Sequence, residues 1–111
     1  MSRDKLGAPI NLGPNIVADG DSEVANMRGA EGARIIVTEV AGGTADIQPQ
    51  GSAEVPVDGA IVNPYPMGGP KALAANETWT RWIGEPNAYL NLNVANVVGA
   101  EVVVELQKFG A

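Results

Sequence analysis

The sequence predicts an all-β protein, a single antiparallel β-sandwich or jelly-roll-like barrel with an extended N-terminal arm. Hydrophobic residues make up 45% of the chain but aromatic residues only 5%, so the core is expected to consist of small and β-branched side chains, which favour strands. Fourteen glycines and eight prolines interrupt long helices and supply turns. Apolar and polar residues alternate with period two in the C-terminal half, as in half-buried strands.

The length of 111 residues fits one domain. Residues 1–32 show no sustained strand or helix periodicity and are predicted to form the arm, whereas residues 33–111 form the sandwich. An extended segment of about 30 residues reaches on the order of 100 Å, far enough to contact neighbouring molecules. A disordered tail, or first strands that belong to the sandwich itself, are the alternatives for this segment.

The first strand of the predicted sandwich covers residues 34–40, which are rich in β-branched side chains. A hairpin turn is expected at residues 42–43, with a return strand over residues 44–48. Both faces of the first strand carry aliphatic side chains, although a free antiparallel sheet normally leaves one face polar. We therefore expect the N-terminal arm or a neighbouring copy to cover the second face.

Further strands follow in order along the chain. Residues 52–57 alternate but contain a proline, which predicts a peripheral strand. Residues 61–70 hold three prolines and two glycines and predict a surface loop. Residues 77–83 alternate and place one tryptophan on each face. The clearest period-two patterns cover residues 89–94 and residues 102–106. These two segments are predicted to pair as an antiparallel hairpin.

Charge and composition exclude several classes of function. Thirteen acids and seven scattered bases give a net charge of −6, so no basic patch for nucleic acid is present. The absence of cysteine and histidine removes disulfides, thiolate nucleophiles, zinc sites and histidine-based triads. We therefore predict a protein that is not an enzyme and has no cofactor. The polar start of the chain, with Arg3, Asp4 and Lys5, predicts neither a signal peptide nor a membrane partner.

Carboxylates give the sequence its weak candidates for chemistry. Asp19, Asp21 and Glu23 lie within five residues in a turn-prone stretch, and hard cations such as calcium bind carboxylate oxygens at this density. The spacing lacks the full ligand run of a calcium loop, so no metal site is predicted and a solvated acidic turn is preferred. Glu101 and Glu105 share a strand face but lie roughly 13 Å apart, too far for a glycosidase pair.

Residues 79–94 (WTRWIGEPNAYLNLNV) and 99–106 (GAEVVVEL) resemble small virion proteins of tailed and other icosahedral phages, such as head decoration (cement) and minor capsid proteins with β-sandwich bodies. The resemblance covers about the last third of the chain. It implies a non-enzymatic structural protein of the virion, made in the host cytoplasm, that decorates or cements a bacteriophage capsid. The implied partners are other copies of the chain, in a homo-oligomer such as a trimer, and the major capsid protein.

This resemblance also implies where the interfaces lie, and removal of residues 1–20 is then expected to abolish binding to the shell while the sandwich stays folded. The alternative is a carbohydrate- or receptor-binding module of a phage fibre or tail, which would use the aromatic and asparagine-rich surface. The expected interface residues are Ile10, Leu12, Ile16 and Val17 in the arm and Trp79, Arg81 and Trp82 in the 77–83 strand.

Overall fold

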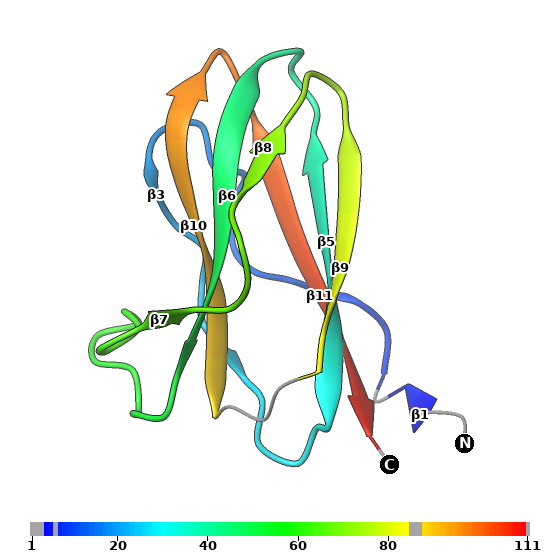
Figure 1. Cartoon of the computed structure of the whole chain (residues 1–111), viewed down its shortest axis with the longest axis vertical. Coiled ribbons are helices and arrows are strands. Elements are labelled where there is room, and N and C mark those ends of the chain that lie inside the picture. The colour runs from blue at the N-terminus through cyan, green and yellow to red at the C-terminus, as the bar shows by residue number, and fades with distance from the viewer. Residues whose placement is uncertain (1–3, 6, 85–87, 111) are drawn as a thin grey trace.

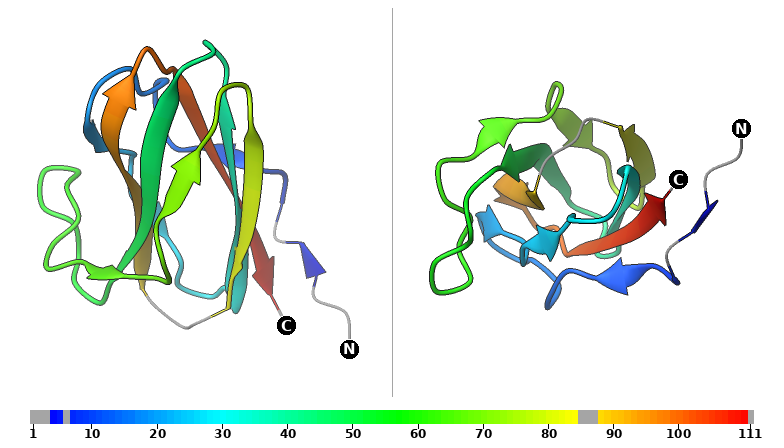
Figure 2. Two further views of the ribbon diagram at one scale, coloured as in Figure 1. Left: turned by 45° about the horizontal axis from the view of Figure 1, so that its top comes forward. Right: turned by 90° about the horizontal axis from the view of Figure 1, so that it is seen from below.

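The structure is a computed structural model that describes residues 4–5, 7–84 and 88–110. The strands of this part of the chain form two antiparallel sheets packed face to face (Figure 1). Figure 2 shows from below how the sheets enclose a common core. The predicted all-β sandwich is confirmed.

Both sheets are built from strands that are far apart in the sequence. The first sheet contains β1 (Asp4–Lys5), β2 (Ile10–Asn11), β11 (Val102–Gly110), β5 (Gly32–Glu39) and β9 (Thr78–Ile83). The second sheet contains β3 (Gly20–Asp21), β4 (Ala25–Asn26), β10 (Tyr89–Val98), β6 (Thr44–Ser52), β7 (Tyr65–Pro66) and β8 (Lys71–Leu73).

Strand pairing is nested, with early strands beside late ones. β2 pairs with β11, β3 and β4 pair with β10, β5 pairs with β9, and β6 pairs with β7 and β8. The chain thus folds like one long hairpin that is wound into two layers. The pairs β11–β5 and β10–β6 form where this wound hairpin meets itself. This strand order is that of a jelly roll, one of the two architectures predicted from the sequence.

The core lies between the sheets and consists of the inward-facing residues predicted from the period-two patterns. Burial of each such aliphatic side chain contributes about 1.5–3 kcal/mol to folding, so the facing strands supply the main stabilisation. The inward residues of the last two strands are at most 3% exposed, namely Leu90, Leu92 and Val94 from β10 and Val102, Val104 and Leu106 from β11.

Two predicted hairpins are wrong in their pairing. β5 and β6 lie in different sheets, and so do β10 and β11. The links at residues 40–43 and 99–101 are therefore arches that cross from one sheet to the other. Alternation shows which side chains of a strand face the core, but it is the same for a hairpin and for an arch.

The N-terminal segment lies along the sandwich instead of reaching away from it. Leu12 is 4% exposed and Ala25 is 3% exposed, both in the core. Leu12 N donates to Val104 O at 2.9 Å, and Ile16 and Val102 exchange two backbone bonds of 2.9 Å. These bonds satisfy edge groups of β11 that would otherwise lack partners. The sandwich therefore begins before residue 33. This agrees with the alternative in which the N-terminal segment contains the first strands of the sandwich.

The segment does not cover the second face of β5, because its strands β1 and β2 pair with β11 and its strands β3 and β4 pair with β10 of the other sheet. On that outer face Arg34 is exposed, and Ile36 and Thr38 are half-buried. Ile36 lies between Glu105 of β11 and Thr80 of β9 in the strand register. The outer face of the first sheet is thus a mixed apolar and polar surface.

Gly43 lies where the two arches touch. A Cβ at this position would lie 2.2 Å from Val98 O and 2.2 Å from the carbonyl carbon of Gly99, and backbone cannot move aside cheaply. We expect Gly43→Ala to reduce the free energy of unfolding by at least about 1–3 kcal/mol in a denaturant titration. Gly69→Ala is the control, because its Cβ would meet nothing within 4 Å. Equal stability of the two variants would contradict the arch packing.

Candidate interaction surface

β9 forms an edge of the first sheet and carries three of the predicted interface residues. Among the described strands it pairs with β5 alone. Trp79 is half-buried and packs against the core, whereas Trp82 on the opposite face is 38% exposed. The prediction of one tryptophan on each face is confirmed.

Arg81 joins β9 to the second sheet. Its Nη1 donates a 2.7 Å hydrogen bond to Gly69 O, and its guanidinium carbon lies 4.7 Å from the centre of the Trp79 ring. The cation–π contact and the hydrogen bond hold the side chain across the gap between the sheets. Arg81 therefore closes this side of the sandwich.

Trp82 belongs to a group of large side chains on the outer face of the first sheet. Its ring lies edge-on to that of Phe109, with 5.3 Å between the ring centres. Arg34 is the register partner of Trp82, and its guanidinium carbon lies 5.8 Å from the Phe109 ring centre. We call Arg34, Trp82 and Phe109 the aromatic cluster. Tryptophan and arginine are the residue types that most often dominate binding energy at protein interfaces.

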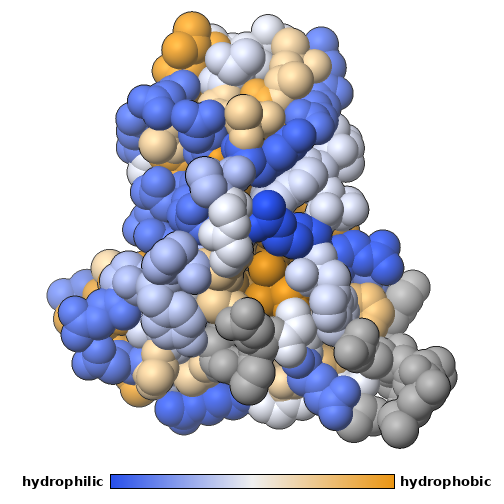
Figure 3. Space-filling model, viewed as in Figure 1, coloured by the Kyte–Doolittle hydropathy of each residue, from blue (hydrophilic) through white to orange (hydrophobic). Residues whose placement is uncertain are grey.

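A hollow of about 170 Å³ lies beside the aromatic cluster, between the edges of the two sheets. Trp82 and Arg81 form part of its wall, and the buried side chains of Met67 and Ile83 supply apolar surface. In Figure 3, hydrophobic (orange) atoms are visible near the middle of this face of the molecule. The hollow thus places both polar and apolar surface beside the exposed ring of Trp82.

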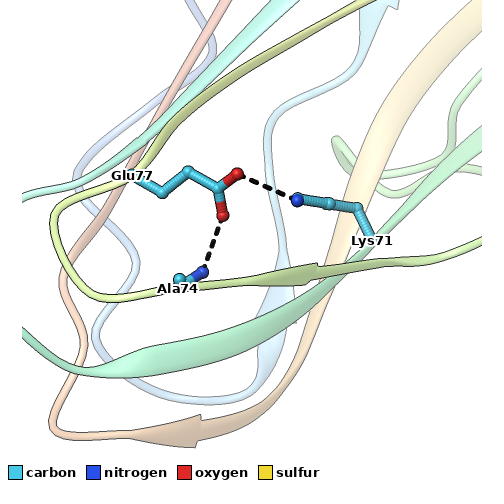
Figure 4. A network of polar contacts seen from close by, with 3 residues as sticks. All are labelled: Lys71, Ala74 and Glu77. Carbon is cyan, nitrogen blue, oxygen red and sulfur yellow. Dashed lines mark hydrogen bonds and ion pairs between the residues drawn. The ribbon is translucent and has the colours of Figure 1, made fainter.

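A second polar contact closes the same side of the sandwich nearer the arches. Lys71 Nζ lies 2.9 Å from one carboxylate oxygen of Glu77, and the other oxygen accepts a 2.8 Å bond from Ala74 N (Figure 4). The bond from Ala74, followed by the contacts with Lys71, lowers the pKa of Glu77. This contact ties β8 to the start of β9.

The predicted interface residues of the N-terminal segment lie on the other side of the first sheet, along β11. Ile10 is 43% exposed and Val17 is 64% exposed, while Ile16 is half-buried beside Val102. The prediction of Leu12 as an interface residue is corrected, because its side chain lies in the chain's own core and cannot contact a partner. The structure therefore divides the predicted interface between two opposite edges of the sheet and does not bring it together.

No protein-family model matches the chain, and no curated protein matches it either. The described residues contain no helix with the length and apolar character needed to cross a membrane.

Two of the three weak metal candidates, Asp19 and Asp21, hold the N-terminal segment to β10. Asp19 Oδ1 accepts a 3.0 Å bond from Val97 N, and Asp21 Oδ1 accepts a 2.9 Å bond from Asn93 Nδ2. Glu23 is exposed. In the described part of the chain, no three side chains of aspartate, glutamate, cysteine or histidine are placed to hold one metal ion.

Glu39 is a residue whose role the sequence reasoning missed. Its side chain is 1% exposed and accepts backbone N–H groups from three connections. The bonds run from Ala41 (2.8 Å), Gly42 (2.7 Å), Asn76 (2.8 Å) and Glu101 (3.1 Å). The bond from Asn76 is the largest cause that lowers the pKa of Glu39 from 4.5 to about 2. A carboxylate at the core-facing position that follows Ile35 and Val37 is the signal that would have revealed it.

Proposed function

We propose that this chain is a non-enzymatic structural protein of the virion, which decorates or cements an icosahedral phage capsid. It associates with its own copies and with the major capsid protein. The observation that carries the proposal is the aromatic cluster, which lies beside an edge strand and a hollow lined in part by Met67 and Ile83. Side chains of this kind anchor interfaces, and an edge strand offers backbone groups to a further strand.

The fold adds support by analogy alone. Jelly rolls form viral capsid domains, although lectins and cupins share the architecture. Ile10 and Val17 offer a second contact edge, on the opposite side of the first sheet from β9. Two edges on one subunit suit a protein that contacts its own copies on one side and the shell on the other.

Light scattering on the purified chain tests the self-association. We expect the wild-type protein to form an oligomer, and Trp82→Ala to weaken its association by about 2 kcal/mol or more, which is roughly 30-fold. Tyr65→Ala is the matched control, since Tyr65 is 40% exposed but lies on β7 of the other sheet. A wild-type monomer at every concentration, or equal weakening by both variants, would contradict the proposal.

A carbohydrate- or receptor-binding module of a phage fibre or tail gains no support from Asn93 and Asn96 of β10. Asn93 donates to Asp21, and Asn96 donates to Asp46 at 2.8 Å, so both amides serve the chain's own acceptors. We expect a panel of glycans to leave the tryptophan fluorescence unchanged. A saturable change with one sugar would favour that module over the capsid protein.

A further inference from the structure

A second hollow, of about 250 Å³, lies on the outer face of the second sheet. One wall is the segment from Asp21 to Glu23, and the other is the turn that carries Asp58. Asn91 of β10 also lines the hollow. It lies on the opposite side of this sheet from the core, because its neighbours Leu90 and Leu92 point inward. This hollow plays no part in the interface proposed above.

Asn91 brings an unsatisfied polar atom to this hollow. Its side chain is 0% exposed, and its Oδ1 has no hydrogen-bond partner among the described residues. Its Nδ2 lies 3.5 Å from Ser22 O, at the limit of a hydrogen bond. Gln50, the register partner of Asn91 on β6, has an unsatisfied Oε1 as well. Buried polar atoms are almost always paired in native proteins, so this pair of amide oxygens marks a place where a donor is needed.

The hollow is also rich in negative charge. Asp21, Glu23 and Asp58 line it, and no lysine or arginine does. The hydroxyl of Ser22 is already used, because it accepts a bond from Leu92 N and donates to Glu23 O. The side-chain acceptors that line the hollow are therefore carboxylate and amide oxygens, and they lie beside the apolar side chains of Ala60 and Ile61. This lining fits an organic cation that carries several N–H donors.

The shape of the hollow favours an organic cation over a metal ion. No three acidic side chains among the described residues converge on one point as a metal ion requires. The volume of about 250 Å³ is on the scale of a small organic group.

We propose that this hollow binds an ammonium or guanidinium group, which donates N–H groups to Asn91 Oδ1 and to the carboxylate of Asp58, while Asp21 and Glu23 add negative charge to the same hollow. The cation comes either from a lysine or arginine side chain of a partner protein or from a free amine. Both sources share the same chemistry at the site. This inference does not depend on the proposed role in the capsid.

The turn that carries Asp58 is rigid enough to present its carboxylate. Val57 N donates to Ala60 O at 3.0 Å, and Ala60 N donates to Val57 O at 2.9 Å. Asp58 and Gly59 have φ values of 51° and 78°, as in the tight hairpin turn that favours Asp-Gly and Asn-Gly pairs. Asparagine suits this conformation as well as aspartate, so Asp58→Asn removes the charge without disturbing the turn.

Titrations followed by two-dimensional amide NMR test the site with two probes, Nα-acetyl-arginine amide and putrescine. We expect saturable shifts at the Asn91 side chain and at residues 58–61. Asp58→Asn is expected to weaken binding roughly tenfold, as for the loss of one charge-assisted hydrogen bond. Glu31→Gln makes the same change in net charge at an exposed residue outside the hollow, and is expected to leave the affinity unchanged.

The choice between the sources follows from the two affinities. Tighter binding of the arginine derivative indicates a protein side chain, and tighter binding of putrescine indicates a free amine. Equal affinities still support the shared chemistry. The proposal is overturned if neither probe gives saturable shifts, if calcium chloride reproduces the shifts, or if Asp58→Asn and Glu31→Gln behave alike. Glu23→Gln, expected to weaken binding in the same direction, repeats the test should Asp58→Asn fail to fold.

Discussion

Deletion of residues 1–20 is expected to unfold the sandwich or to lower its free energy of unfolding by at least about 2–5 kcal/mol, the usual range for loss of one buried leucine. The deletion removes Leu12 from the core and takes away the backbone partners of Val102 and Val104 on β11. This result differs from the one expected of a reaching arm, whose loss would leave the body intact. Urea unfolding followed by circular dichroism measures it.

Val17→Ala serves as the control within the same segment. Val17 is 64% exposed, and substitutions at such positions usually change stability by no more than about 0.5 kcal/mol. Leu12→Ala alone is expected to produce a large part of the loss caused by the deletion. If the shortened protein unfolds at the same urea concentration as the full chain, the packing of the N-terminal segment has no energetic weight and the structural account is refuted.

Replacement of Glu39 by glutamine is expected to cause the largest loss of stability among single polar substitutions in this chain. The carboxylate accepts four backbone N–H groups, and the amide of glutamine offers one acceptor oxygen in place of two. The amide nitrogen would then face N–H groups that have no acceptor. Thermal unfolding near neutral pH measures the effect.

Acid titration of the wild-type protein tests the same residue in a second way. The pKa of Glu39 is about 2 in the folded chain against 4.5 for an unperturbed glutamate. A lowered pKa in the folded state means that the contribution of this carboxylate is complete above about pH 4.5. It is lost as the pH falls towards 2, because the unfolded chain takes up the proton first.

The matching controls separate Glu39 from the other carboxylates. Glu39→Gln is expected to lose the larger part of the acid dependence, and Glu77→Gln a smaller part, since the pKa of Glu77 is also lowered. Glu31→Gln changes an exposed carboxylate and is expected to follow the wild-type curve. A Glu39→Gln variant that keeps the full wild-type dependence on pH would show that this carboxylate does not hold the arches.

The sequence was a good guide to individual strands. Alternation correctly placed Leu90, Leu92 and Val94 in the core, and it put Trp79 and Trp82 on opposite faces. Local pattern was sufficient here because the side-chain period of a strand is a property of the backbone itself. It could not assign pairing partners, so two arches were predicted as hairpins.

The candidate surface was predictable only in part. Trp82 stood out as an aromatic residue on a strand, but its neighbours Phe109 and Arg34 come from β11 and β5. Asn91 could be recognised only as one of several asparagines, because its unsatisfied oxygen depends on what lies around it in space. Glu39 gave a usable signal, since its position continues the inward series of β5.

The sequence by itself determined that this chain is all-β, where its five long strands lie and which side of most of them faces the core. It did not predict the short strands, and residues 53–57, expected to be part of a peripheral strand, form none. Only the tertiary structure decided that strands near the start of the chain pair with those near its end, so that Ile16 lies beside Val102. Strand periodicity is set by each residue's own backbone and by its neighbours. Pairing is set by competition among all free edges and apolar faces at once, and that competition is resolved only when the whole core is buried.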